Sequence, residues 1–211
     1  MKLLAISKFL SLAASFSTIG LLLAMGFFLI DTEGKLGESA RKLRSFAAAS
    51  ATVWGLATGL SILATLANIL GTNFGDALDP TSIRSFVTQI ALGKYMFIQM
   101  CFALLVASIV FRIRSVASSN ALLLLSMVAL VAPVFESHSA SSGSHALAIG
   151  SLVVHVVAIS VWVGGLAAIA FLNAAERAVA LPRFSALALW AAIAVAISGT
   201  ANRSEEHTSE L

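Results

Sequence analysis

The sequence predicts an all-α fold, a polytopic transmembrane helix bundle with about six spans, and three observations support this. Hydrophobic residues make up 59% of the 211 positions and charged residues only 11%, with a mean hydropathy of +0.96. Soluble domains carry about 25% charged residues, so this chain has too little polar surface to coat a water-soluble globule. Apolar runs of membrane-spanning length also follow one another along the sequence. Lipid is therefore the expected solvent.

The first three apolar runs cover residues 9–30, 46–70 and 94–111. The first is long enough to cross a hydrocarbon core of about 30 Å, and it exceeds the roughly 7–15 apolar residues of a signal peptide. The second run is rich in glycine and alanine, which suits close helix packing. Residues 71–80 form a polar connection, and the half-polar residues 81–93 predict a short helix at the membrane interface.

The other three runs cover residues 121–135, 146–172 and 184–201. The fourth is short and is closed by Pro133 and Glu136. The loop before the fifth reads ESHSASSGSH and contains no lysine or arginine, and residues 173–183 are predicted to form the turn before the sixth. The final segment, residues 203–211, resembles the translation of a sequencing adapter, so we exclude it from the fold.

The distribution of lysine and arginine predicts the orientation. Basic residues cluster at Lys35, Arg41, Lys42, Arg44, Arg112, Arg114, Arg177 and Arg183, whereas the other side of the membrane holds Lys2, Lys8, Arg84 and Lys94. The positive-inside rule places the richer side in the cytoplasm, and the amino terminus and histidine loop outside. The net charge of +3 therefore indicates topology rather than nucleic-acid binding. An outside start suggests that an earlier helix precedes this sequence.

The histidine-rich loop is the densest group of potential metal ligands. His138 and His145 lie in it, His155 follows, and Glu136 adds an oxygen donor. Imidazole binds copper, zinc, iron and nickel well, so this composition predicts an exposed metal-capture site. The alternative is a solvated polar loop, because the histidine spacing matches no compact ligand motif.

His155 lies inside the fifth apolar run, about 15 Å along a helix from His145. A titratable group at that depth is costly unless it faces the bundle or a polar cavity, which makes it a functional candidate. The alternative is a neutral histidine hydrogen-bonded to a neighbouring helix. Further along the same run, Gly164 and Gly165 leave a smooth patch where another helix can approach closely.

Sulfur-containing residues cluster in the third run, where Met96 and Met100 are four residues apart and Cys101 adjoins them. Soft sulfur ligands prefer Cu(I), so the two methionines could form a step in a copper path, although ordinary packing is the simpler interpretation. The sequence contains no nucleophile with a base, no phosphate-binding glycine loop and no nucleic-acid motif. We therefore expect no enzymatic activity.

The fifth run reads SHALAIGSLVVHVVAISVWVGGLAAIAFL and resembles the copper-resistance D (CopD) family, whose pattern is an outer histidine, an intramembrane histidine and W-V-G-G-L. These correspond to His145, His155 and residues 162–166. The segments GDALDP, SFVT, GK and SGTAN, at residues 75–80, 85–88, 93–94 and 198–202, add to the resemblance. The chain is most similar to actinobacterial members in which this region precedes a cytochrome c oxidase assembly (CtaG-like) region.

The resemblance implies a multi-pass cell-membrane protein for copper uptake or copper resistance. His145 and His155 would be the principal copper ligands, with Glu136 and His138 ranking lower. Residues 46–202 would form a truncated copper-handling domain after a first span and cytoplasmic loop in residues 1–45. An extracytoplasmic copper chaperone or a cytochrome c oxidase subunit would be the partner.

Two alternatives stay open. The chain could be a non-transporting cytochrome c oxidase assembly factor that scaffolds copper delivery. A haem-binding cytochrome or sensor would need two histidines at similar depth, and His155 alone lies well inside a span.

Overall fold

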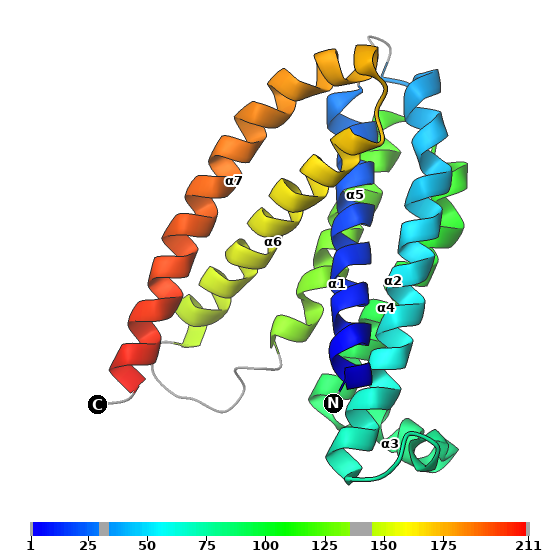
Figure 1. Cartoon of the computed structure of the whole chain (residues 1–211), viewed down its shortest axis with the longest axis vertical. Coiled ribbons are helices and arrows are strands. Elements are labelled where there is room, and N and C mark those ends of the chain that lie inside the picture. The colour runs from blue at the N-terminus through cyan, green and yellow to red at the C-terminus, as the bar shows by residue number, and fades with distance from the viewer. Residues whose placement is uncertain (1, 30–33, 136–144, 210–211) are drawn as a thin grey trace.

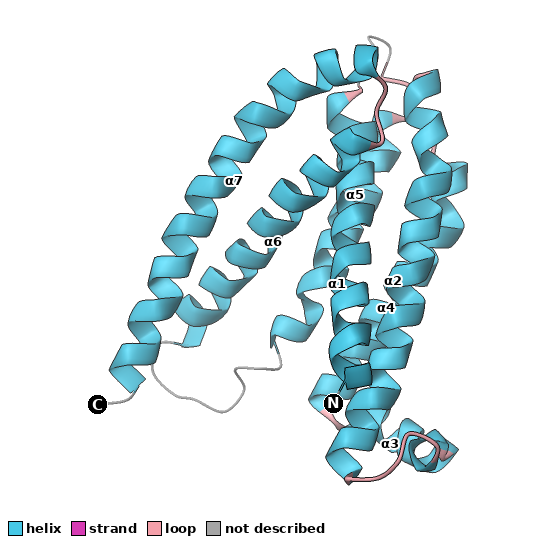
Figure 2. Ribbon diagram, in the orientation of Figure 1, coloured by secondary structure: helices cyan, strands magenta, loops and turns pink. Residues whose placement is uncertain are grey.

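The fold consists of long helices packed side by side. The computed structural model describes residues 2–29, 34–135 and 145–209, with the backbone alone for residues 145–148 and 201–209. Within these ranges every named element is a helix (Figures 1 and 2). The α-helices are α1 (Lys2–Leu23), α2 (Glu38–Leu70), α3 (Pro80–Gln89), α4 (Ala91–Ile109), α5 (Val116–Val131), α6 (His145–Ala170) and α7 (Ala174–Ser209).

Six helical segments in the described part of the chain are long and apolar enough to cross a membrane. They are Lys2–Phe28, Glu38–Leu70, Ala91–Arg112, Val116–Phe135, Ile149–Ala170 and Ala174–Thr200. The predicted all-α, six-span membrane bundle is therefore confirmed. The order of the spans brings both ends of the chain to the same end of the bundle (Figure 1).

The predicted turn at residues 173–183 is wrong, because α7 begins at Ala174 and contains this segment. Asn173 and Glu176 cap its start reciprocally: the Glu176 amide donates to Asn173 Oδ1 at 3.0 Å, and the Asn173 amide donates to Glu176 Oε2 at 2.9 Å. This capping box begins the helix before the basic residues that suggested a turn. Pro182 lies inside the helix, which membrane-spanning helices tolerate.

The first four spans also begin earlier than their apolar runs, the third at Ala91 rather than residue 94 and the fourth at Val116 rather than residue 121. The first starts at Lys2 rather than residue 9, and the second at Glu38 rather than residue 46. The added turn of α2 alternates exposed Arg41 and Lys42 with buried Ala40 and Leu43. A helix is thus longer than its hydrocarbon-crossing part, because one face can pack while the other meets water. At the other end of the chain, α7 continues to Ser209, through the segment excluded from the predicted fold.

α1 lies at the centre of the bundle and α7 at its edge (Figure 1). The apolar window of the first span is 67% buried, compared with 17% for the last. α1 packs against α2, α5 and α6, whereas α7 packs mainly against α6. The α6–α7 pair therefore joins the rest of the bundle chiefly through α1.

The contact between α1 and α6 depends on glycine. A Cβ atom added to Gly20 would overlap the backbone of Gly164, and one added to Gly164 would overlap the carbonyl oxygen of Phe16. The expected close approach at Gly164 is therefore confirmed. Its partner is the backbone of α1.

Arginines close the carbonyl ends of three spans at one end of the bundle. We call this the basic end, and it comprises residues 34–44, 110–115 and 171–183. Guanidinium groups there donate to backbone carbonyls as follows: Arg183 to Phe28 (2.7 Å), Arg177 to Leu172 (2.7 Å), and Arg44 to Phe111 and Ile113 (3.1 Å each). The last carbonyls of a helix have no partner within it, and cations there are favoured by the helix dipole.

The predicted short helix is confirmed as α3, although it begins at Pro80 rather than residue 81 and ends at Gln89 rather than residue 93, and its place at the membrane interface stays a prediction. Pro80 opens it, and the Asp79 carboxylate accepts a hydrogen bond from the Ser82 amide at 2.8 Å. This bond, together with the Ser82 hydroxyl, lowers the pKa of Asp79. Phe86 is the buried anchor of the helix. Asp79 is thus a helix cap.

Candidate metal site

His155 lies within the fifth span and pairs with α7. Its Nδ1 atom is 3.1 Å from the hydroxyl oxygen of Ser198, which is only 4% exposed. Ser151, one turn before His155 on α6, donates its hydroxyl proton to the Ser198 carbonyl at 2.9 Å. Two hydrogen bonds therefore hold this part of α6 to α7. The serine of the SGTAN segment and the intramembrane histidine meet in space.

The hydrogen bonds of Ser198 assign the tautomer of His155. A serine hydroxyl has only one proton to donate. The Ser198 hydroxyl oxygen lies 2.6 Å from the carbonyl oxygen of Ala194, and a carbonyl oxygen can only accept a hydrogen bond. Because the hydroxyl proton goes to Ala194, the imidazole donates its Nδ1 proton to the Ser198 oxygen. In the neutral imidazole, Nε2 then carries the lone pair. No residue that the structure describes hydrogen-bonds to Nε2.

The neighbouring glycine leaves space beside the imidazole. A Cβ atom added to Gly199 would lie 3.7 Å from His155 Cε1, which is ordinary van der Waals contact. Alanine would fit there, whereas a longer side chain would compete with the ring for space. Cε1 lies between the two ring nitrogens, so Gly199 adjoins the nitrogen-bearing edge of the imidazole.

The other predicted ligands of the histidine loop cannot be placed. Glu136 and His138 lie outside the described residues, and only the backbone of His145, the first residue of α6, is described. Among the side chains that are described, no group of three histidine, cysteine, aspartate or glutamate residues could hold a metal ion. The multidentate outer site stays a prediction.

Met96 and Met100 reach the same α2–α4 interface but line different cavities. Met96, 7% exposed, lines a cavity of about 300 Å³ between the helices. Met100 packs with its sulfur against Gly59 and lines an apolar groove of about 390 Å³. Cys101 is exposed at the bundle surface. The two methionines therefore do not share a cavity, and a copper path through the cavity of Met96 would not include Met100.

The cavity lined by Met96 contains several polar side chains within a mainly apolar lining, and we call it the hydroxyl cavity. Its polar lining comes from α1, α2 and α4 and consists of Lys8, Ser11, Ser15, Thr58, Ser61 and Gln99. Hydroxyl pairs join α1 to α2 around it: Ser7 with Ser61 (2.9 Å), Ser11 with Thr58 (2.8 Å) and Thr18 with Ser50 (2.9 Å).

The residue pattern of the first span contains a signal for this cavity. Ser7, Ser11, Ser15 and Thr18 recur at spacings of four, four and three, so they share one helical face. Single serines in a membrane span usually indicate helix packing, which is why the hydroxyl cavity was not predicted. Val156 of α6 also lines the hydroxyl cavity. The residue that α6 contributes to the cavity wall is therefore the one that follows His155 in the sequence.

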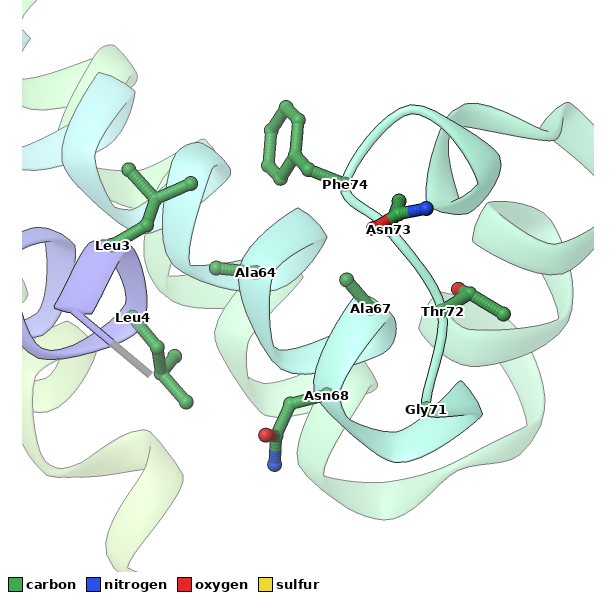
Figure 3. A pocket seen from close by; sticks show the side chains of 9 residues that line it. All are labelled: Leu3, Leu4, Ala64, Ala67, Asn68, Gly71, Thr72, Asn73 and Phe74. Atoms are coloured by element: carbon green, nitrogen blue, oxygen red, sulfur yellow. The ribbon is translucent and has the colours of Figure 1, made fainter.

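A further cavity, of about 370 Å³, lies where the start of α1 meets the end of α2 (Figure 3). Leu3, Leu4, Ala64 and Asn68 line it from the two helices, with residues 71–74 closing it. None of its lining residues is titratable or contains sulfur. It therefore offers no metal ligand of the predicted kind.

A family model described as copper resistance protein D-like, N-terminal domain, matches residues 2–147. Comparison with curated proteins and with solved structures gives no match. The matched part contains Met96, the polar lining of the hydroxyl cavity and the histidine loop, and it ends before His155 and Val156. Because it covers well over half of the sequence, the chain belongs to the copper resistance protein D-like (CopD) family.

Proposed function

We propose that this protein transports copper across the cell membrane, for uptake or resistance, with His155 as the ligand inside the membrane. The observation that carries the proposal is the His155–Ser198 pair, which leaves the lone pair of Nε2 available to a metal. Copper is then a cargo that the protein binds and releases, and no chemical conversion is required. Family membership supports a role in copper handling.

Ser198 has a role that metal sites commonly need. A metal-binding histidine usually donates its other ring proton to a protein acceptor, which fixes the tautomer and the ring orientation and raises the basicity of the ligand. Here the acceptor is a serine hydroxyl that α7 holds against its own backbone. We propose that Ser198 orients His155 for copper.

The predicted outer loop would supply copper to this site. The positive-inside rule predicts that the histidine loop lies outside the membrane. There, Glu136, His138 and His145 would capture the ion. His155 lies about 15 Å further along α6 if the ion travels beside the helix. Met96 supplies a thioether that suits Cu(I) in the adjoining hydroxyl cavity. This order of sites is part of the proposal.

The experiment compares three variants of the purified protein in proteoliposomes supplied with cuprous ion under reducing conditions, and in parallel with cupric ion. We expect His155→Ala to reduce copper flux at least tenfold. Ser198→Ala should weaken copper binding by about 10-fold to 100-fold, the usual effect of removing a partner of a metal-bound histidine. Ser160→Ala is the matched control, because that buried hydroxyl bonds only within α6, to the Val157 carbonyl at 2.8 Å.

The results separate transport from the alternatives. Unchanged flux in His155→Ala would refute the role of His155. Copper binding by the intact protein without any flux would instead support a non-transporting assembly factor that presents copper to a chaperone or an oxidase subunit. Absence of copper binding would refute both accounts.

A further inference from the structure

We propose a binding site for an anionic phospholipid headgroup at the basic end of the bundle, in a cavity of about 450 Å³. Its lining consists of Lys35, Leu36, Arg41, Arg44, Phe111 and Arg114. We call this the basic cavity. It is independent of the copper pathway proposed above.

All charged residues in the described lining of the basic cavity are positive. Four of the six carry a positive charge and none carries a carboxylate. Glu38 follows closely in sequence, but it pairs with Lys42 at 3.1 Å, and neither of these residues lines the cavity. A concentration of like charge in a shared concavity favours an anion, and phosphate is the natural partner of arginine.

Two of the guanidinium groups line the cavity without a partner among the described residues. Those of Arg41 and Arg114 form no hydrogen bond or ion pair with the part of the chain that the structure describes, and both side chains are exposed. Arg44 is held in place instead: its Nη1 donates to the carbonyls of Phe111 and Ile113, and its Nε to that of Arg41. Arg44 therefore forms a fixed charged wall.

The backbone holds the two sides of the cavity together. Lys35 and Ser115 form an antiparallel bridge, in which the Leu36 amide donates to Arg114 and the Val116 amide to Gly34, each at 3.0 Å. This bridge joins the segment before α2 to the segment before α5. Arg41 and Arg114, far apart in sequence, thus line one concavity before any ligand arrives.

The start of α2 adds to the positive potential. Its N-cap is Gly37, which has no side chain to accept from the first helical amides. Glu38 in the first turn offsets part of the positive partial charge at the amino end of this helix, and the remainder adds to the charge of the cavity, which Leu36 and Arg41 line.

A lipid fits the location better than a soluble phosphate. The basic cavity lies where the spans Glu38–Leu70 and Ala91–Arg112 reach the bundle end, and the ends of spanning helices are where lipid headgroups meet a membrane protein. The exposed ring of Phe111 adds apolar surface suited to the glycerol and upper acyl region. Basic pockets between spanning helices are typical sites for anionic headgroups.

The test measures, by native mass spectrometry of the full chain in detergent, retention of dioleoylphosphatidylglycerol, dioleoylphosphatidylcholine and inorganic phosphate. We expect one phosphatidylglycerol to be retained at least fivefold more tightly than phosphatidylcholine. Arg41→Gln and Arg114→Gln should each weaken it about fivefold, the effect of one basic residue at an anionic surface. Arg114→Lys should retain most of the affinity.

Arg112→Gln is the matched control, because it removes the same charge two residues from Arg114, at a side chain that does not line the cavity. It should change retention less than twofold.

Equal losses in Arg112→Gln and Arg114→Gln, or equal retention of the two lipids, would overturn the proposal. Inorganic phosphate that displaces phosphatidylglycerol at similar concentration would overturn the lipid as the ligand. Should Arg114→Gln fail to fold, Arg41→Gln decides alone. Copper binding is not measured, so failure here leaves the proposed function untouched.

Discussion

Gly164→Ala is expected to separate α6 from α1. In the native bundle these helices touch through backbone, and a Cβ atom on residue 164 would overlap the carbonyl oxygen of Phe16 and lie 3.1 Å from the amide nitrogen of Gly20. Ordinary contacts of a Cβ atom begin near 3.4 Å. A backbone carbonyl cannot rotate away as a flexible side chain can. The two helices must therefore move apart.

The size of the effect follows from two opposing contributions. Alanine is favoured over glycine in a helix by about 1 kcal/mol, so an open glycine should gain stability on substitution. A gap of about 0.5–1 Å between packed surfaces loses a quarter to a half of their dispersion attraction. Overpacking of this kind costs about 1–3 kcal/mol. We expect Gly164→Ala to lower the free energy of unfolding by about 2 kcal/mol.

The assay is unfolding of the purified protein in detergent, followed by circular dichroism during titration with sodium dodecyl sulfate. Gly150→Ala is the control, because Gly150 lies on the same helix and a Cβ atom there would meet nothing within 4 Å. It should match the native protein or exceed its stability by up to about 1 kcal/mol. If Gly164→Ala were as stable as Gly150→Ala, the backbone contact of α1 and α6 would not hold the bundle together.

Other expectations follow from the helix ends. Arg183→Gln should lower the free energy of unfolding by about 1 kcal/mol, measured in the same titration, because it weakens the charged hydrogen bond to the Phe28 carbonyl. Asn173→Ala should lower it by a similar amount, about 1 kcal/mol, since it removes the cap of α7. The Ser82 amide should keep its protection from hydrogen exchange at neutral pH and lose it as the pH falls below 3.8. The reason is that the pKa of Asp79 is lowered in the folded state, so its cap is present above the unfolded pKa and is lost on protonation. Unchanged protection at pH 2 would contradict that assignment.

The spans could be predicted from run length because each membrane-crossing helix satisfies its own backbone and needs only enough apolar residues. The starts of α2 and α7 could not be located in this way. Their first turns are polar, since they emerge from the hydrocarbon, and composition alone resembles a loop. The capping box of Asn173 and Glu176 is a sequence signal for α7 that the clustered basic residues obscured.

The candidate site was predictable only in part. His155 stands out in the sequence because an ionisable group within a span is costly. Its partner Ser198, 43 positions later, does not, because serines are common in membrane helices. The assignment of Met96 and Met100 to different cavities also depends on how α4 lies against α2, which no spacing along a single helix reveals.

The sequence by itself determined the solvent, the number of spans and the side on which positive charge gathers, because these depend on composition and order along the chain. Only the tertiary structure decided what those residues contact. Arginines that indicate topology also close the carbonyl ends of helices and line the basic cavity. Serines that suggest packing also surround the hydroxyl cavity and set the tautomer of His155. Hydrogen bonds and cavities join residues from different helices, so they exist only once the helices have packed.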